Sequence, residues 1–408
     1  MNHSSLTLFH PTGILNGVVP LPSSKSESNR ALVMQALSGG KITLENLSEA
    51  RDTQTMIRLL HSSDLVCDVI DAGTTMRFLT AYFTAKNRET ILTGTERMCE
   101  RPIGILVNAL RSIGADIRYV GKEGYPPIHI KHFSQTTSAV SIRGDVSSQY
   151  ISALLMIAPC LPKGLHITLE GEIASRPYLE MTLELLAYFG IAHRWEGQTI
   201  HIPPQNYQAN HYIVESDWSG ASYWFSMAAL AKEAQIKLLN LKEKSLQGDR
   251  VIVEIAEKLG VKTSFVSDGL LLTKKETHVA ELSFDFTHCP DLAQTIAVLC
   301  AALGVKARLS GLKSLRIKET DRIAAVQNEL QKLGIMVNVE GDEALAIYPS
   351  SLQLANQPVI RTYDDHRMAM AFAPLALLSP IRIEHPNVVE KSYPSFWKHL
   401  KQIGFREV

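Results

Sequence analysis

The sequence predicts an α/β protein built from copies of one unit of about 70 residues. Two recurring patterns lead to this fold class. First, small and polar residues run directly into a longer apolar segment six times along the 408-residue chain. With Gly73, Ser147, Ser219, Asp291 and His366 as markers, successive copies are 74, 72, 72 and 75 residues apart. Second, helical patterns between these openings end at glycine and lead into short strand pairs.

Each polar opening is typical of a helix start. The openings are residues 23–26, 72–75, 146–149, 217–220, 289–291 and 364–367. Glycine and short polar side chains leave backbone N–H groups available there, and the helix dipole adds to their attraction for anions. Six such starts in one chain predict a shared anion-binding function, although the start at 217–220 is expected to be mainly structural.

The glycine endings and the strand pairs complete the unit. The endings are Gly114, Gly190, Gly260, Gly334 and Gly404, where glycine is the expected C-terminal cap of a helix. Residues 117–119 with 128–130, and 337–339 with 345–347, alternate as the strands of a hairpin do. The unit is therefore helix, strand, helix and hairpin.

The first copy is expected to be shortened. Between Met56 and Asp71 there is no leucine-glycine ending and no room for a hairpin. The markers Lys25 and Gly73 are accordingly only 48 residues apart. We expect function to survive this loss at some cost in stability.

Six copies divide naturally into two domains of three. The expected domains are residues 23–215, and residues 1–22 plus 216–408, so that the second domain contains both termini. The strand-like residues 6–8 favour placing the N-terminus with the second half of the chain.

Composition narrows the functional classes. Lys and Arg together number 41, as do Asp and Glu, so no overall basic field attracts nucleic acid. No apolar run approaches the roughly 18 residues of a membrane span, and the N-terminus lacks the pattern of a secretory signal. Five cysteines without metal-ligand spacing indicate reduced thiols. We therefore expect a cytoplasmic protein that binds neither nucleic acid nor membrane.

The opening after Pro22 is the first place where chemistry can be argued. It leads into a helix that presents Ser26 and Arg30 on one face, with Lys25 at its start. This combination would grip a phosphate or a carboxylate. It is not a P-loop, because the spaced glycines are missing and Ser24 precedes the lysine. A capped helix with a solvated lysine is the alternative.

A second charged segment is expected to place Lys318 and Arg322 on one helical face, with Glu319 beside them and Arg316 just before. A dianionic substrate would use the cations to hold its phosphate or carboxylate while the glutamate handles a proton. A solvated charge run is the alternative, and the same holds for Lys391.

The third group surrounds Arg367, which enters an apolar helix. Its charge would be costly to bury alone, so it needs a partner. A ligand carboxylate, or an internal ion pair with Asp364 or Asp365, would supply one. Glu100 and Arg101 pose a similar choice between a ligand site and a surface ion pair.

Taken together and in order, these motifs resemble the 5-enolpyruvylshikimate-3-phosphate (EPSP) synthase family over nearly the whole chain. The matching segments are residues 23–31, 71–77, 100–104, 146–149, 316–322 and 364–369. The resemblance implies a two-domain enolpyruvyl transferase fold, with three βαβαββ repeats in each domain and an active site in the cleft between them. It implies transfer of the enolpyruvyl group of phosphoenolpyruvate to the 5-hydroxyl of shikimate 3-phosphate, with release of phosphate, in aromatic amino acid biosynthesis.

The resemblance also implies roles for individual residues. Phosphoenolpyruvate would be bound by Lys25, Gly73, Arg101, Gln149, Arg322, Arg367 and Lys391. Shikimate 3-phosphate would be bound by Lys25, Ser26, Arg30, Ser147, Ser148, Gln149, Ser175, Asp291, Ser314 and Lys318, with Tyr178 nearby. Asp291 would take the hydroxyl proton, while Glu319 and Lys25 would exchange the proton at the methylene carbon. No metal or organic cofactor is implied, and we expect a monomer that glyphosate inhibits.

Four positions depart from the family's pattern. Asp71, Ser314 and Asp364 stand where the family usually has asparagine, and Phe78 stands where it has proline. An acidic Asp71 near phosphoenolpyruvate would be unfavourable unless it is paired or turned away.

Two rival functions remain at this point. The related UDP-N-acetylglucosamine enolpyruvyl transferase carries a cysteine where this chain has Glu96, five residues before Arg101, and Cys99 is out of register. A non-catalytic phosphate-binding repeat scaffold would not need the acids Asp291 and Glu319 among so many cations.

Overall fold

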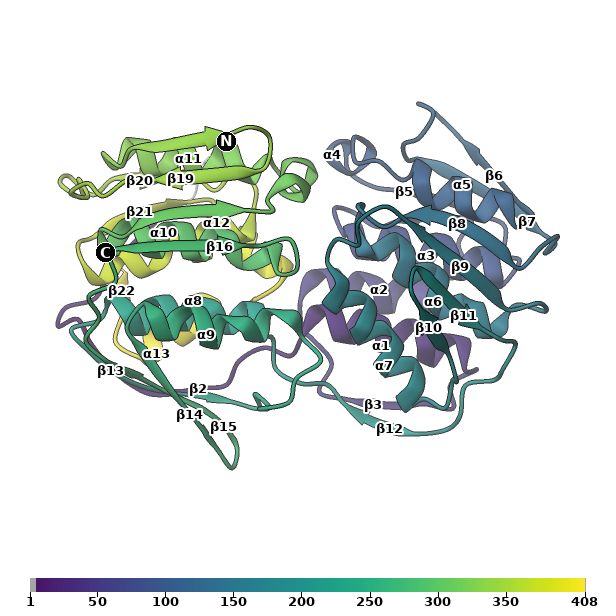
Figure 1. Ribbon diagram of the computed structural model, residues 1–408, viewed down its shortest axis with the longest axis horizontal. Coiled ribbons are helices and arrows are strands. Elements are labelled where there is room, and N and C mark those ends of the chain that lie inside the picture. The colour runs from purple at the N-terminus through teal and green to yellow at the C-terminus, as the bar shows by residue number, and fades with distance from the viewer. Residues whose placement is uncertain (1–4, 408) are drawn as a thin grey trace. The chain divides into compact units, whose positions relative to one another are not determined.

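The computed structural model describes residues 5–407, which form two compact units. The N-unit is Ser24–Val214, and the C-unit contains the described residues up to Ser23 together with those from Glu215 onward. The chain therefore begins in the C-unit, passes through the N-unit and returns, as the colours of Figure 1 trace. Strand β1 (Ser5–Phe9) pairs with β21 (Ile381–Glu384) and β22 (Arg406–Glu407), so this strand belongs to a sheet of the second half of the chain.

The N-unit alternates helices and short strands. Its helices are α1 (Lys25–Leu37), α2 (Arg51–His61), α3 (Gly73–Ala85), α4 (Glu96–Cys99), α5 (Gly104–Ser112), α6 (Ser148–Ile157), the 3₁₀ turn Ala158–Cys160 and α7 (Arg176–Tyr188). Its strands are β3 (Thr43–Glu45), β4 (Val66–Asp68), β5 (Thr90–Thr93), β6 (Ala115–Tyr119), β7 (Ile128–Phe133), β8 (Ala139–Arg143), β9 (Leu165–Glu170), β10 (Arg194–Glu196), β11 (Thr199–Ile202) and β12 (His211–Ile213).

The sheets of the N-unit confirm the shortened first copy. Two sheets have four strands each, in the orders β4-β5-β7-β6 and β10-β11-β9-β8. The third is the parallel pair β12 and β3. Only residues 62–65 separate α2 from β4, so the hairpin that completes the other copies is missing after α2.

The C-unit repeats the same pattern. Its remaining strands are β2 (Ile14–Val19), β13 (Glu233–Leu239), β14 (Val261–Val266), β15 (Gly269–Lys274), β16 (Glu281–Asp285), β17 (Lys306–Ser310), β18 (Val337–Glu340), β19 (Ala344–Ile347) and β20 (Val359–Ile360). Its helices are α8 (Trp218–Leu230), α9 (Ile252–Lys258), α10 (Ala293–Leu303), α11 (Arg322–Lys332), α12 (His366–Phe372) and α13 (Phe396–Gln402). Its 3₁₀ turns are Gly248–Val251, Pro290–Leu292, Lys313–Ile317, Ala373–Leu377 and Pro386–Lys391. Its described strands form four-stranded sheets in the orders β14-β15-β13-β2, β16-β17-β19-β18 and β20-β21-β1-β22.

Three central helices pack together inside each unit: α1, α3 and α6 in the N-unit, and α8, α10 and α12 in the C-unit (Figure 1). Every residue of α8 except Ser219 is buried, and all of α12 is buried. Helices that are apolar all round belong in a core, which explains the unbroken apolar segments of the sequence. All six polar openings begin these central helices or lead into them.

Four of the six polar openings supply side-chain caps for their helix starts, whereas α3 and α10 begin without one. The side chains of Ser24, Ser147, Asp217 and Asp365 accept hydrogen bonds from backbone N–H groups in the first turns of α1, α6, α8 and α12. The expected helix starts are therefore confirmed, and at 217–220 the cap and the buried Trp218 fit a structural role.

The glycine endings and hairpins are confirmed as well. The five expected endings have positive φ: Gly114, Gly190, Gly260, Gly334 and Gly404. Ile117 pairs with Ile130, and Val337 pairs with Ile347, in the hairpins β6–β7 and β18–β19.

One local expectation is wrong. Lys318 and Arg322 do not share a helical face, because α11 begins at Arg322 and Lys318 is extended, with φ −82° and ψ −153°. The helix starts late because Asp321 is its cap, accepting from the Ala324 N–H at 3.1 Å while also pairing with Arg316.

Candidate functional site

The starts of four helices meet in the N-unit. Gln149 Nε2 in α6 donates to Thr74 Oγ1 in α3 at 2.9 Å. Lys25 Nζ at the start of α1 lies 3.0 Å from Asp52 Oδ2 in α2, and Thr75 Oγ1 in α3 donates to the Asp52 carbonyl at 3.3 Å. The polar openings of this unit are thus linked to one another through side chains.

Asp52 is a functional candidate that sequence reasoning missed. Its side chain is 3% exposed and holds the ammonium group of Lys25, which is 15% exposed, at the start of α1. The available signal was an acidic residue in the first turn of the helix of the shortened copy. Its neighbour Arg51 pairs with Asp71 at 2.9 Å. Asp71, which stands where the family usually has asparagine, therefore has an ion-pair partner.

The start of α3 is shaped around two arginines. A methyl group added at Gly73 would lie 2.6 Å from Arg77 Nη1 and 2.7 Å from Arg101 Nη1. Glycine therefore lets both guanidinium groups approach the helix start closely. Arg77 also donates to the Gly73 carbonyl at 3.0 Å. Arg101 is buried, and Glu100 pairs with Arg97 instead. The alternative of a surface ion pair between Glu100 and Arg101 is therefore wrong.

Arg30 is a buried cation of α1. Its guanidinium donates to Thr182 Oγ1 at 2.7 Å, to the Ser26 carbonyl at 2.9 Å and to Ser152 Oγ at 3.2 Å. The Tyr178 carbonyl accepts a further bond, and the guanidinium lies 6.0 Å from the Tyr178 ring. Burial lowers the pKa of Arg30 to about 10. Arg30 is consequently tied to α7 as well as to α1.

The remaining N-unit candidates are serines at helix starts. Ser147 is the N-terminal cap of α6, and the buried Ser148 is the first residue of this helix. Ser175 precedes α7 with a left-handed backbone, φ 54°. Such a conformation is uncommon for a residue with a side chain and marks a constrained position.

In the C-unit, Arg322 is the centre of an ion-pair network. Its side chain is 2% exposed, and it contacts Asp365 Oδ2 at 2.7 Å, Glu319 Oε2 at 2.9 Å and Asp291 Oδ1 at 3.1 Å. Burial alone would lower the pKa of Arg322, but Asp365, Glu319 and Asp291 outweigh it and raise the pKa above its ordinary value.

Asp291 connects the network to α12 and α8. Arg367 Nη2 lies 2.7 Å from Asp291 Oδ2, and Arg367 Nη1 lies 3.3 Å from the Tyr223 hydroxyl. The internal partner of Arg367 is therefore Asp291, and the pairing expected with its neighbours Asp364 or Asp365 is corrected. Burial raises the pKa of Tyr223 to about 12. Tyr223 escaped sequence reasoning because it sits in the apolar run of α8 with no signal of its own.

Lys391 completes the network. It is 1% exposed and lies 3.8 Å from Glu319 Oε1, so it is not a solvated side chain. Two further candidates lie just before Glu319 in the sequence. Ser314 is in the 3₁₀ turn Lys313–Ile317, Lys318 follows that turn, and both side chains are half-buried. The network contains three cations and three carboxylates: Arg322, Arg367, Lys391, Asp291, Glu319 and Asp365.

Exposure separates the three carboxylates. Asp291 is 22% exposed and Glu319 13%, whereas Asp365 is fully buried. Asp291 and Glu319 can therefore offer an oxygen to a ligand, while Asp365 fixes Arg322 from behind. Cations and accessible carboxylates in contact can bind anionic groups and exchange protons with them.

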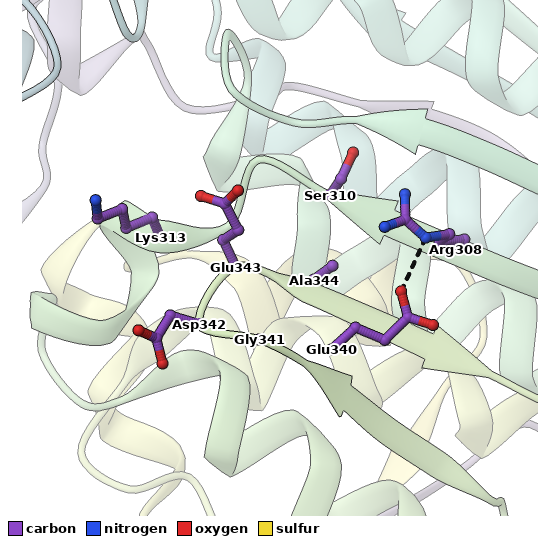
Figure 2. A pocket seen from close by; sticks show the side chains of 8 residues that line it. All are labelled: Arg308, Ser310, Lys313, Glu340, Gly341, Asp342, Glu343 and Ala344. Carbon is purple, nitrogen blue, oxygen red and sulfur yellow. Dashed lines mark hydrogen bonds and ion pairs between the residues drawn. The ribbon is translucent and has the colours of Figure 1, made fainter.

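A surface hollow of the C-unit lies apart from this network. It is lined by Arg308, Ser310, Lys313, Glu340, Gly341, Asp342, Glu343 and Ala344, and Figure 2 shows Arg308 paired with Glu340 on its wall. It contains no residue of the expected site. Among residues 5–407 no group of three or more His, Cys, Asp or Glu side chains is placed to hold a metal ion. Within the same range, no helix is long and apolar enough to cross a membrane.

Solved structures define the fold class. An EPSP synthase from Acinetobacter baumannii is similar to the chain with a TM-score of 0.77 at 19% identity, covering 99% of each chain. The enolpyruvyl transferase NikO from Streptomyces tendae is similar with a TM-score of 0.73 at 14% identity, covering 100% of this chain and 99% of that one. The expected enolpyruvyl transferase fold is confirmed.

Sequence comparisons identify the family within this fold class. A family model described as EPSP synthase (3-phosphoshikimate 1-carboxyvinyltransferase) matches residues 10–63 and 59–400. A 3-phosphoshikimate 1-carboxyvinyltransferase of Bacteroides fragilis (strain YCH46) is 49% identical over 393 residues, 96% of each chain. One from Salmonella arizonae is 37% identical over 98% of this chain and 99% of its own. The chain belongs to the EPSP synthase family.

Proposed function

We propose that the N-unit helix starts and the C-unit ion network act on the same two substrates in one reaction. The protein is an enzyme, a 3-phosphoshikimate 1-carboxyvinyltransferase of the shikimate pathway. Its substrates are phosphoenolpyruvate and shikimate 3-phosphate, and the UDP-N-acetylglucosamine alternative is set aside. The observation that carries the residue assignments is the convergence of Asp291, Glu319 and three buried cations in the C-unit.

The cations would bind the phosphate and the carboxylate of phosphoenolpyruvate. The proposed set is Lys25, Gly73, Arg101 and Gln149 from the N-unit, with Arg322, Arg367 and Lys391 from the C-unit. Arginine suits this role because its planar fork matches phosphate and carboxylate oxygens. The close approach of Arg101 to Gly73 supports the assignment, since an anion at the start of α3 would meet both the helix dipole and the guanidinium.

Hydroxyl-rich helix starts would bind shikimate 3-phosphate. The proposed set is Lys25, Ser26, Arg30, Ser147, Ser148, Gln149 and Ser175 from the N-unit, with Asp291, Ser314 and Lys318 from the C-unit. The caps at Ser24 and Ser147 leave other N–H groups of the first turns for a phosphate.

Proton transfer is assigned to the accessible acids. Carbon 3 of phosphoenolpyruvate gains a proton while the 5-hydroxyl attacks carbon 2, and the resulting tetrahedral intermediate loses phosphate together with a proton from carbon 3, which restores the double bond. Asp291 would accept the hydroxyl proton, and Glu319 and Lys25 would exchange the proton at the methylene carbon. The arginines would stabilise the charge of the leaving phosphate. The assignment invokes no metal or organic cofactor, and we propose that the enzyme acts as a cytoplasmic monomer.

The reaction is tested by phosphate release from phosphoenolpyruvate. Release is expected with shikimate 3-phosphate and not with UDP-N-acetylglucosamine as acceptor. Glu319→Gln should lower turnover by about 10²–10⁴-fold, the range for loss of a general acid or base. The matched control is Glu340→Gln, because Glu340 pairs with Arg308 on the surface hollow, outside the network (Figure 2). Full activity of Glu319→Gln would remove Glu319 from the mechanism.

A further inference from the structure

A buried carboxylate outside the proposed chemistry holds the segment that leads into α12. Glu329 of α11 has a fully buried side chain. Its Oε1 accepts a hydrogen bond from the Tyr363 hydroxyl at 2.7 Å, and its Oε2 accepts one from the Arg361 backbone N–H at 3.1 Å. Lys332, one turn further along α11, is its charge partner. Burying a carboxylate is costly unless it is paired and hydrogen-bonded, and this carboxylate directs two of its bonds to one segment.

That segment has an unusual backbone. Tyr363 and Asp364 have φ angles of 53° and 54°, in the left-handed region that residues with side chains seldom adopt. They stand directly before Asp365 and Arg367. Consecutive left-handed residues persist only where surrounding contacts over-determine them, and such strain concentrates at functional sites. The Glu329 contacts fall on Tyr363 and on Arg361 just before it, where they restrain this conformation.

Helix α11 contacts the segment 361–365 at two points. At its start, Arg322 binds Asp365 Oδ2 at 2.7 Å, and Asp365 Oδ1 accepts from the Arg367 backbone N–H at 2.8 Å. Seven residues later, two turns along the same helix, Glu329 holds Tyr363. Because a helix is rigid over two turns, the second contact fixes how Asp365 meets Arg322 and where Arg367 lies in the first turn of α12.

We propose that the Glu329–Tyr363 hydrogen bond is a positioning device for Arg322 and Arg367 in carboxyvinyl transfer. This inference rests on the proposed roles of these two arginines in binding phosphoenolpyruvate. Neither Glu329 nor Tyr363 touches a substrate; they act through the segment between them and the arginines.

One further contact keeps the tyrosine in place, and its hydroxyl stays protonated. The Arg361 guanidinium lies 5.3 Å from the centre of the Tyr363 ring. Burial, followed by the hydrogen bond to Glu329 and its charge, raises the pKa of Tyr363 to about 12. The hydroxyl therefore stays protonated and remains a donor near neutral pH.

The test is Tyr363→Phe, which removes the hydroxyl and keeps the ring. The KM for phosphoenolpyruvate should rise about tenfold, the order expected for losing a hydrogen bond to a charged group, while the KM for shikimate 3-phosphate changes little. Adding Asp364→Gly should restore most of the affinity, because glycine adopts the left-handed conformation without cost. Asp364→Gly alone should leave the kinetics close to those of the unmodified enzyme.

The control is Tyr207→Phe, which removes another tyrosine hydroxyl, a buried one that donates to the Met156 carbonyl at 2.6 Å in the N-unit. It should lower stability without changing either KM. An unchanged KM for phosphoenolpyruvate in Tyr363→Phe, or a rise that Asp364→Gly does not reverse, overturns the proposal. Arg367→Lys distinguishes a failure of the proposed phosphoenolpyruvate site from a failure of the positioning role. If it leaves this KM unchanged, the proposed binding site is wrong; if it raises the KM while Tyr363→Phe does not, only the positioning role is wrong.

Discussion

The two units hold their buried arginines Arg30, Arg77 and Arg322 in different ways. In the N-unit, Arg30 and Arg77 rest largely on neutral acceptors, such as the carbonyls of Ser26 and Gly73. Neutral acceptors orient a guanidinium without cancelling its charge. In the C-unit, Arg322 is surrounded by carboxylates, so the charges of the network are compensated internally. The N-unit is thus suited to binding anions, whereas the C-unit also contains the acids that can move protons.

The largest expected effect tests this division of labour. Asp291→Asn in the C-unit should reduce kcat by about 10²–10⁴-fold with a small change in KM, because it removes a proton acceptor. Ser148→Ala in the N-unit should raise the KM for shikimate 3-phosphate and leave kcat nearly unchanged, because it removes uniform binding. Steady-state phosphate release with each substrate varied measures both. Equal losses of kcat in the two variants would contradict the comparison.

Stability should respond unequally to breaking one ion pair in each unit. Asp365→Ala removes the fully buried carboxylate partner of the 2% exposed Arg322, which keeps Glu319 and Asp291, and should cost about 3 kcal/mol, the lower end of the range for breaking a buried pair. Asp52→Ala removes one carboxylate partner of Lys25, which is 15% exposed and can reach water, so about 1–2 kcal/mol is expected. Urea unfolding of the two variants compares them. A loss for Asp52→Ala as large as that for Asp365→Ala would show that exposure does not decide the cost.

The repeat itself could be predicted because its signals are local. A cap such as Ser147, a glycine ending such as Gly190 and an alternating pair such as β18–β19 each act within a few residues. The shortened first copy followed from the same spacing argument.

The partners inside the site could not be predicted in this way. Asp291 and Arg367 are 76 residues apart, and Lys25 meets Asp52 across two helices, so their contacts depend on tertiary packing. Arg322 was assigned by resemblance, yet its place as the first residue of α11 depends on the Asp321 cap, which the charge run concealed. Long-range pairing leaves no periodic trace in one sequence.

Two glycines at helix starts offer a smaller test. Gly73→Ala should raise the KM for phosphoenolpyruvate about tenfold and weaken inhibition by glyphosate, because the new methyl group displaces Arg101 and Arg77. Gly220→Ala, at the structural opening of α8, is the matched control, since its nearest neighbour would lie at an ordinary 3.6 Å. Steady-state kinetics and glyphosate titration read out both variants. If Gly220→Ala shifts the KM equally, crowding at Arg101 is not the cause.

The smallest expected effect concerns pH and is confined to the C-unit. His399 Nδ1 lies 2.9 Å from the Tyr393 hydroxyl, which also accepts a bond from Trp224 Nε1 at 3.2 Å. The tyrosine hydroxyl can donate its one proton to His399 Nδ1 when that nitrogen is unprotonated. Burial, with a contribution from Lys398, lowers the pKa of His399 below 6.5.

Between the lowered pKa and 6.5 the folded protein binds fewer protons than the unfolded chain. The stability that His399 contributes is therefore complete above pH 6.5 and is lost as the pH falls towards its folded pKa, at no more than about 1.4 kcal/mol per pH unit. Urea unfolding measures the free energy of unfolding at about pH 7.5 and about pH 5.5, which bracket this window. The difference between the two free energies should be smaller for His399→Gln than for the unmodified enzyme. The exposed His61→Gln in the N-unit should retain the full difference, and equal pH dependence in both variants would place the acid-sensitive group elsewhere.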